Sequence, residues 1–167
     1  YYCPHLLQTP VLFCGDTLFS AGCGRVFDGT MAQAFESIAQ FLQLPDATLI
    51  ACAHEYTLSN LAFALRIQST HEPTQAYLNQ VKYARERGLP SLPSRMALES
   101  SVNPFCRAVN MCVTSASVDT DWIEGLNLLA QSVGLDTLPT TAPAAETARS
   151  EWALALFTLC RELKNRM

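Results

Sequence analysis

Two short apolar segments with a helical segment between them constrain the fold of this chain most strongly. Residues 11–14 (VLFC) and 48–53 (TLIACA) are short apolar runs, which is typical of buried strands. Between them, Thr30 followed by Gln33 forms a capping-box pattern, and apolar residues recur at helical spacing as far as Pro45. This order of strand, crossover helix and strand indicates an α/β layer.

In the rest of the chain the apolar pattern becomes helical. Thr57 can cap one helix, and Pro73 and Gly88 bracket a second. A third helix is expected over about 120–133, and a linker at 139–145 precedes the last one. The last helix carries a single apolar stripe, formed by Trp152, Leu156, Leu159 and Leu163.

The composition excludes several classes of partner. With 167 residues, 49% of them hydrophobic, the chain can bury the core of one domain or two small ones. A formal charge of −4 predicts no nucleic-acid binding, and no apolar run reaches the roughly 20 residues of a membrane span.

Seven cysteines without a CxxC pair argue against a disulfide framework, so we expect a reducing, cytoplasmic location. The start shows neither a secretory signal nor a Met, so we expect a fragment.

An aspartate and a histidine directly follow the two predicted strands. Asp16 lies in the sequence GDTLF, and His54 begins the sequence HEYT. Side chains at the ends of strands that are joined through a helix can converge on one edge of a sheet and hold a metal ion. The alternative for Asp16 is a turn carboxylate that accepts backbone N–H bonds. These motifs favour a metal-assisted hydrolase.

Four segments resemble one known family. Residues 15–25 (GDTLFSAGCGR) and 53–57 (AHEYT) closely resemble glyoxalase II, the hydroxyacylglutathione hydrolase of the metallo-β-lactamase superfamily. Residues 103–107 (NPFCR) and 161–165 (RELKN) match the helical domain of that family. The resemblance spans nearly the whole chain.

The resemblance implies both a fold and an activity. The fold is α/β, with the C-terminal half of a metallo-β-lactamase αββα sandwich over 1–56 and an all-α substrate-binding domain over 57–167. The activity is hydrolysis of the thioester S-D-lactoylglutathione to glutathione and D-lactate, a step of methylglyoxal detoxification, by a metal-bound hydroxide. Members of the family use two divalent metal ions, usually zinc but also iron or manganese. Asp16 matches the carboxylate that bridges the ions, and His54 matches a ligand of the second ion.

The chain lacks most of the metal ligands of the family. The T-H-x-H-x-D-H motif is absent, and the three histidines are His5, His54 and His71. We expect a surface position for His5 and a turn or cap role for His71. Since a zinc site needs three or four protein ligands, we expect an N-terminally truncated chain that is weak or inactive alone, from a monomeric parent protein.

The resemblance assigns substrate contacts to four residues. Arg25 and Tyr56 match positions that line the glutathione site, and Arg161 and Lys164 match a basic pair that holds the glycine carboxylate of glutathione. The alternative for the basic pair is complementation of the helix dipole, and Tyr56 can be simple packing at a helix entry. Phe27 stands where some members of the family carry a tyrosine.

Two other functions remain open. A persulfide dioxygenase of the same superfamily would use one iron and glutathione persulfide, but such relatives generally lack the long helical domain. A non-catalytic module would bind a glutathione-like ligand or a partner through an exposed sheet face.

Overall fold

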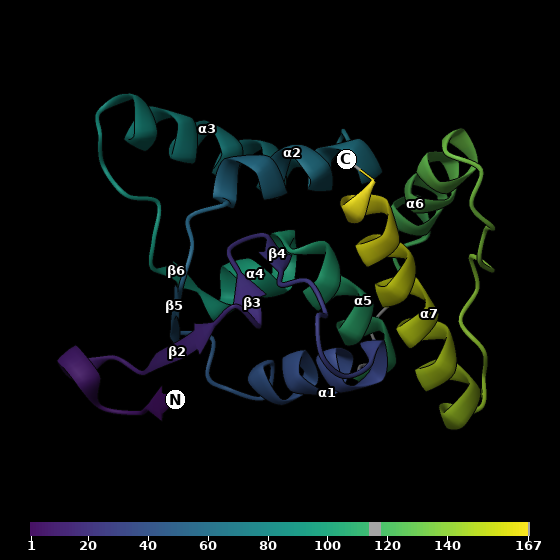
Figure 1. Ribbon diagram of the computed structural model, residues 1–167, viewed down its shortest axis with the longest axis horizontal. Coiled ribbons are helices and arrows are strands. Elements are labelled where there is room, and N and C mark those ends of the chain that lie inside the picture. The colour runs from purple at the N-terminus through teal and green to yellow at the C-terminus, as the bar shows by residue number, and fades with distance from the viewer. Residues whose placement is uncertain (114–117, 167) are drawn as a thin grey trace.

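A small mixed sheet occupies one side of the computed structural model, which describes residues 1–113 and 118–166 (Figure 1). Its strands lie in the order β1-β2-β5-β6. They are β1 (Tyr2–Cys3), β2 (Val11–Gly15), β5 (Leu49–Cys52) and β6 (Ser94–Arg95). A short 3₁₀ helix, η1 (Leu6–Gln8), joins β1 to β2. The two central strands are parallel, and each edge strand is antiparallel to its neighbour.

Helix α1 (Met31–Phe41) makes the crossover between β2 and β5, as the apolar pattern predicted. The capping box is confirmed: the Thr30 hydroxyl accepts the Gln33 N–H at 3.2 Å, and the Gln33 side chain accepts the Thr30 N–H at 2.8 Å. Ile38 is the buried residue of this helix, whose inner face packs against the later helices.

A hairpin of two very short strands follows β2. It consists of β3 (Leu18–Phe19) and β4 (Gly22–Cys23), and all four residues are buried. The apolar pattern did not predict this hairpin, because strands of two residues are too short to show alternation. For the same reason β1 and β6 were not predicted.

After β5, the described part of the chain contains the short strand β6 and six helices. They are α2 (Thr57–Ile67), α3 (Glu72–Glu86), α4 (Met96–Val102), α5 (Pro104–Val113), α6 (Thr120–Ser132) and α7 (Glu146–Asn165). Thr57 was predicted as a cap, but Tyr56 is the cap residue and makes no side-chain capping bond. Pro73 stands in the first turn of α3, as predicted, and Gly88 follows its end with φ +70°.

One apolar core draws on the sheet and on the helices. Leu12 and Ile50 from the sheet belong to the same buried cluster as Trp122, Phe105 and Phe157. The predicted stripe of the last helix is confirmed, since all four of its residues are buried. Each such side chain contributes roughly 1.5–3 kcal/mol when it leaves water. The mixed α/β fold with a helical C-terminal part, as predicted, is thus held together as one packed body.

The helices lie along two sides of the molecule and between them. In Figure 1, α2 and α3 run together along one side of the molecule and α1 along the other, with α4 and α5 between them. The C-terminal end of α7 reaches α2. No helix in residues 1–113 or 118–166 has both the length and the apolar character that crossing a membrane requires.

Candidate active site

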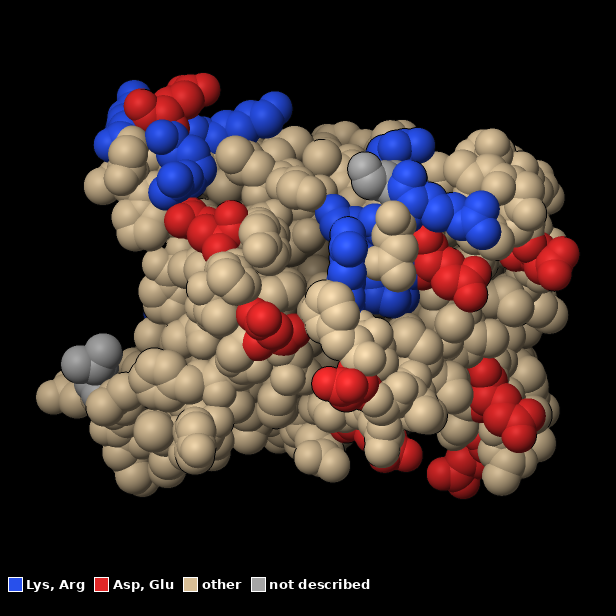
Figure 2. Space-filling model, in the orientation of Figure 1, with Lys and Arg blue, Asp and Glu red and all other residues tan. Residues whose placement is uncertain are grey.

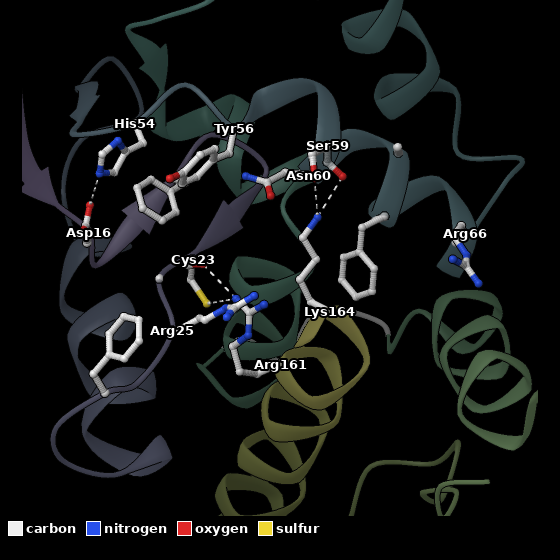
Figure 3. Close-up of a pocket in the computed structure, with 15 residues that line it drawn as sticks. Asp16, Cys23, Arg25, His54, Tyr56, Ser59, Asn60, Arg66, Arg161 and Lys164 are labelled. Carbon is white, nitrogen blue, oxygen red and sulfur yellow. Dashed lines mark hydrogen bonds and ion pairs between the residues drawn. The ribbon is translucent and has the colours of Figure 1, made fainter. Parts of the chain in front are cut away.

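The ends of the two parallel strands bring Asp16 and His54 together. Gly15 pairs with Cys52 across the sheet, and the Ala53 N–H donates to the Gly15 carbonyl at 3.1 Å. The residues that follow therefore leave the same edge, and Asp16 Oδ1 lies 3.6 Å from His54 Nε2 (Figure 3). As the motifs predicted, the two side chains converge, and both are more than half exposed at 66% and 51%. This geometry favours a ligand pair over the turn-carboxylate alternative.

The sheet edge provides two metal-type ligands and no complete set. Across the described ranges, no group of three or more His, Cys, Asp or Glu side chains could hold an ion. The nearby thiols are engaged otherwise: Cys14 donates to the Leu18 carbonyl at 3.2 Å, and Cys52 donates to the His54 carbonyl at 3.4 Å. Burial raises the pKa of Cys14 to about 11 and also raises that of Cys52, so both stay protonated at neutral pH. A carboxylate and an imidazole fit a divalent cation, but two ligands are fewer than a zinc site needs.

Aromatic rings hold the histidine from two sides. The ring of Tyr56 stacks on His54 with centroids 5.2 Å apart and an interplanar angle of 21°. Phe19 from the hairpin lies edge-on to Tyr56 at 5.2 Å and tilted against His54 at 6.1 Å. Tyr56 is half exposed, so one edge of its ring faces the adjoining pocket.

A pocket of about 610 Å³ runs from this edge toward the C-terminal end of α7. Asp16 and His54 line one end, and four cationic side chains also line the pocket: Arg25, Arg66, Arg161 and Lys164. Figure 2 shows Lys and Arg side chains gathered on this face. The single acidic group in the lining is Asp16, so the pocket is electropositive and suits an anionic ligand.

Arg161 forms the floor of the pocket. Its side chain is buried, with 6% of the residue exposed, and Nη1 donates to the Cys23 carbonyl at 3.0 Å. The guanidinium lies 5.4 Å from the Phe105 ring centroid, and its Nε has no hydrogen-bond partner in the described residues. Complementation of a helix dipole needs no such burial, so this position favours a binding role.

Lys164 lies one helical turn further along α7. Its ammonium group donates to the carbonyl and the hydroxyl of Ser59, at 2.9 and 3.1 Å, and lies 5.3 Å from the Phe63 ring. Burial, and secondarily the charge of Arg161, lower the pKa of Lys164 to about 8. An anionic ligand would stabilise the charged form of Lys164 and raise its pKa again, so the pocket suits such a ligand.

The remaining lining residues include two predicted and several missed positions. Arg25 and Phe27 lie exposed at the rim, Phe27 with 84% of its surface accessible. The motifs did not predict the contribution of α2, whose lining residues include Ser59, Phe63 and Arg66. Their helical spacing was the available signal, but such a face is common on ordinary amphipathic helices. His5 is exposed, as predicted. His71 is at the N-cap position of α3, where it makes no side-chain capping bond to the backbone and its Nδ1 lies 2.7 Å from the Thr74 hydroxyl.

Fold and site together define a mixed α/β protein with a cation-lined pocket in its helical part beside a carboxylate–imidazole pair. The family model described as "Hydroxyacylglutathione hydrolase C-terminus" matches residues 55–167. The chain therefore belongs to the hydroxyacylglutathione hydrolase family, and the resemblance seen in the motifs is confirmed.

Curated relatives that match the chain carry the name hydroxyacylglutathione hydrolase, and three of them show the extent of the similarity. That of Albidiferax ferrireducens is 47% identical over 116 residues, which cover 70% of this chain and 46% of the relative. That of Pectobacterium carotovorum is 53% identical over 100 residues, and that of Yersinia pestis is 52% identical over 100 residues. The last two alignments each cover 60% of this chain and 40% of the relative. The chain thus spans less than half the length of these relatives.

Proposed function

We propose that this chain is the substrate-binding part of a thioester hydrolase that converts S-D-lactoylglutathione to glutathione and D-lactate. One observation carries the proposal: a single pocket has the Asp16–His54 pair at one end and buried or half-buried cations along α7 at the other. Such a pocket can hold an anionic tripeptide by its carboxylate and present a thioester to the pair. The relatives named hydroxyacylglutathione hydrolase support the same reading.

The proposed architecture follows the same relationship. Residues 1–56 form the second half of a metallo-β-lactamase αββα sandwich, and residues 57–167 form the helical domain. The two parts share one apolar core, and β6 adds a strand from the later part to the sheet of the first. Because of this shared core, the chain acts as one unit. The proposal also takes the parent protein to be a monomer located in the cytoplasm. The seven cysteines, which form no disulfide, support a reducing location.

Recognition of the ligand rests on the cations. Arg161 and Lys164 hold the glycine carboxylate of glutathione, with Arg25 at the rim, because charge-assisted bonds in a half-buried pocket are stronger than those on an open surface. The Tyr56 hydroxyl adds a polar contact at the mouth. The stacked rings of Tyr56 and Phe19 shield His54 on two sides and keep its imidazole facing Asp16.

Asp16 and His54 would hold the metal ions, Asp16 as a bridging ligand and His54 as a ligand of the second ion. Zinc is proposed first, with iron or manganese as the alternatives. A bound divalent cation would polarise the thioester carbonyl and lower the pKa of a water molecule. Further ligands must come from outside the described residues, so the chain alone should bind metal weakly and hydrolyse slowly or not at all.

The test is the hydrolysis of S-D-lactoylglutathione by the complete, metal-loaded protein. The release of free thiol measures the rate of this reaction. We expect turnover that D16N or H54A abolishes, while K164M raises KM and leaves kcat nearly unchanged. Oxidation of glutathione persulfide, or cleavage of another ester or a lactam without activity on this thioester, would contradict the proposal.

A further inference from the structure

A buried polar network surrounds the tip of the β3–β4 hairpin. The Glu99 carboxylate is fully buried and accepts the Ser20 hydroxyl at 2.9 Å, the Ala21 N–H at 2.7 Å and the Asn103 amide at 3.0 Å. The Tyr77 hydroxyl lies 2.9 Å from that of Ser20 and donates to it, because Ser20 gives its own hydrogen to Glu99. Every partner of Glu99 is then a donor, which suits the ionised carboxylate.

Asn103 joins both strands of the hairpin to the helices. Its amide nitrogen also lies 3.2 Å from the Phe19 carbonyl and 2.9 Å from the Gly22 carbonyl, so its two hydrogens are shared among these and Glu99, while its oxygen accepts the Phe105 N–H at 3.0 Å. One side chain therefore binds β3, β4, Glu99 and the start of α5. This is the first residue of the sequence NPFCR, to which the pocket itself gives no role.

The hairpin tip is held in a conformation that it would not prefer alone. Ala21 has φ +56°, a left-handed geometry that costs a non-glycine residue free energy. It is fully buried against Leu61 and Tyr77, and its N–H points at Glu99. Such strain persists only where the surroundings determine the conformation, and here the surroundings are the network.

The two ends of this hairpin touch both members of the candidate metal pair. Phe19 packs against the rings of His54 and Tyr56. At the other end, Gly24 lies so close to the Asp16 carbonyl that a Cβ atom at this position would collide with it. A movement of the hairpin would therefore move Asp16 and release the imidazole at the same time.

Burying a carboxylate without a cation is costly, which makes a merely structural role a poor explanation. In the described parts of the chain, Glu99 forms no ion pair with Lys, Arg or His, and burial raises its pKa while Asn103, Ala21 and Ser20 oppose the rise. An apolar side chain would fill the space at lower cost but could not orient three donors.

We propose that Glu99 and Asn103 are positioning residues, which lock the β3–β4 hairpin so that it fixes the relative placement of Asp16 and His54. The hydrogen-bond network by itself supports this positioning role. That Asp16 and His54 form an active site rests on the proposed function. Neither residue lines the pocket, so both act through the hairpin.

The first experiment observes the His54 ring directly in this chain. The sequence has three histidines, so their ring signals can be resolved by NMR and assigned by substitution. In E99Q and in N103L, we expect loss of the nuclear Overhauser contact between His54 and Phe19. Zinc affinity, measured by titration of the His54 signal, should be roughly tenfold weaker than in the unsubstituted chain. Replacing a residue that supports a metal ligand typically has an effect of this size. Affinity for S-methylglutathione should fall less than zinc affinity. Lys164 bonds to Ser59 of α2 and is independent of the hairpin, whereas Arg161 bonds to the Cys23 carbonyl of β4.

The matched control is D119N, which makes the same carboxylate-to-amide change in another network. Asp119 pairs with Arg107 and caps α6, away from the hairpin. D119N should lower the melting temperature while the His54 contacts remain. If N103L does not fold, E99Q alone decides, because Gln keeps the shape and most acceptor bonds. Unchanged His54 contacts and zinc affinity in folded E99Q would overturn the proposal, as would equal losses in D119N.

The second experiment separates positioning from stability in the complete protein. E99Q should lower kcat about tenfold, with a smaller effect on KM for the glutathione thioester, which Arg161 can transmit through its bond to Cys23 of β4. A KM effect without a kcat effect would refute a positioning role. If the unsubstituted protein fails to hydrolyse the thioester, the proposed function fails, and the ring contacts of His54 still decide the role of Glu99.

Discussion

The two ends of the pocket are built in opposite ways. At the sheet edge, Asp16 and His54 are exposed and face each other, and the backbone register of β2 and β5 brings them to the same edge. At the α7 end, Arg161 and Lys164 are drawn into the protein and are already bonded to the Cys23 and Ser59 carbonyls. On the proposed function, the end that binds the substrate is preorganised within this chain, while the end that binds metal draws further ligands from outside the described residues. Binding and catalysis should therefore be separable by experiment.

The largest effect is expected at the sheet edge. H54A in the complete protein should lower kcat by more than about a hundredfold, beyond the range for residues that only support a ligand. Affinity for S-methylglutathione should not change, because the cations lie at the other end of the pocket. Steady-state kinetics and calorimetric titration measure the two quantities. Loss of ligand affinity in H54A would show that the two ends are not independent.

Removing the half-buried charge on α7 should have the next largest effect. K164M keeps the length of the side chain but deletes a charge-assisted bond, worth about 1.5–3 kcal/mol, so KM should rise about ten- to hundredfold. The rate kcat should hold. K82M, on the outer face of α3, is the control with the same change away from the pocket. Equal effects of the two substitutions would mean that the response reflects overall charge.

The depressed pKa of Lys164 predicts a pH dependence of binding. Since that pKa is about 8, the charged fraction falls between pH 7 and pH 9, and affinity for S-methylglutathione should fall about tenfold. K164M should abolish this part of the response. Calorimetric titration at several pH values, with this variant as reference, measures it. A pH profile that is the same in both proteins would contradict the assignment.

Folding stability responds to the same group with the opposite sign. The unfolded chain keeps this proton up to its ordinary pKa of 10.5, while the folded chain loses it from about 8. The unfolded state then binds more protons than the folded state. The contribution of Lys164 to the free energy of unfolding should therefore increase as pH rises from 8 to 10.5. Weaker binding at pH 9 is thus distinguishable from unfolding.

Arg66 should show the smallest effect and marks the limit of the cationic end. It lines the pocket but is exposed, and exposed charges contribute about 0.2–1 kcal/mol. R66A should raise KM no more than about fivefold, and added salt should remove the difference. R87A, an exposed arginine at the end of α3, is the control. A loss as large as that of K164M would extend the preorganised end along α2.

The strand–helix–strand unit and helices α2, α3, α6 and α7 were predictable because their signals are local, whereas α4 and α5 were not predicted. Thr30 and Gln33 specify the start of α1 through their own bonds, and the stripe beginning at Trp152 specifies the buried face of α7. The hairpin gave no such signal, since its four strand residues are buried by neighbours far along the chain. Its position depends on Glu99 and Asn103, about eighty residues away, as the separations of 79 and 84 residues in two of its hydrogen bonds show.

The sequence by itself determined which groups are available: one carboxylate and one histidine at strand ends, and a pair of cations three residues apart near the C-terminus. Local chemistry sufficed because strand ends and helical spacing follow from short-range patterns. Only the tertiary structure decided how deeply each group lies and what it bonds to. Burial of Arg161 and Lys164, and the hairpin that holds the pair, depend on long-range packing, which no local pattern carries.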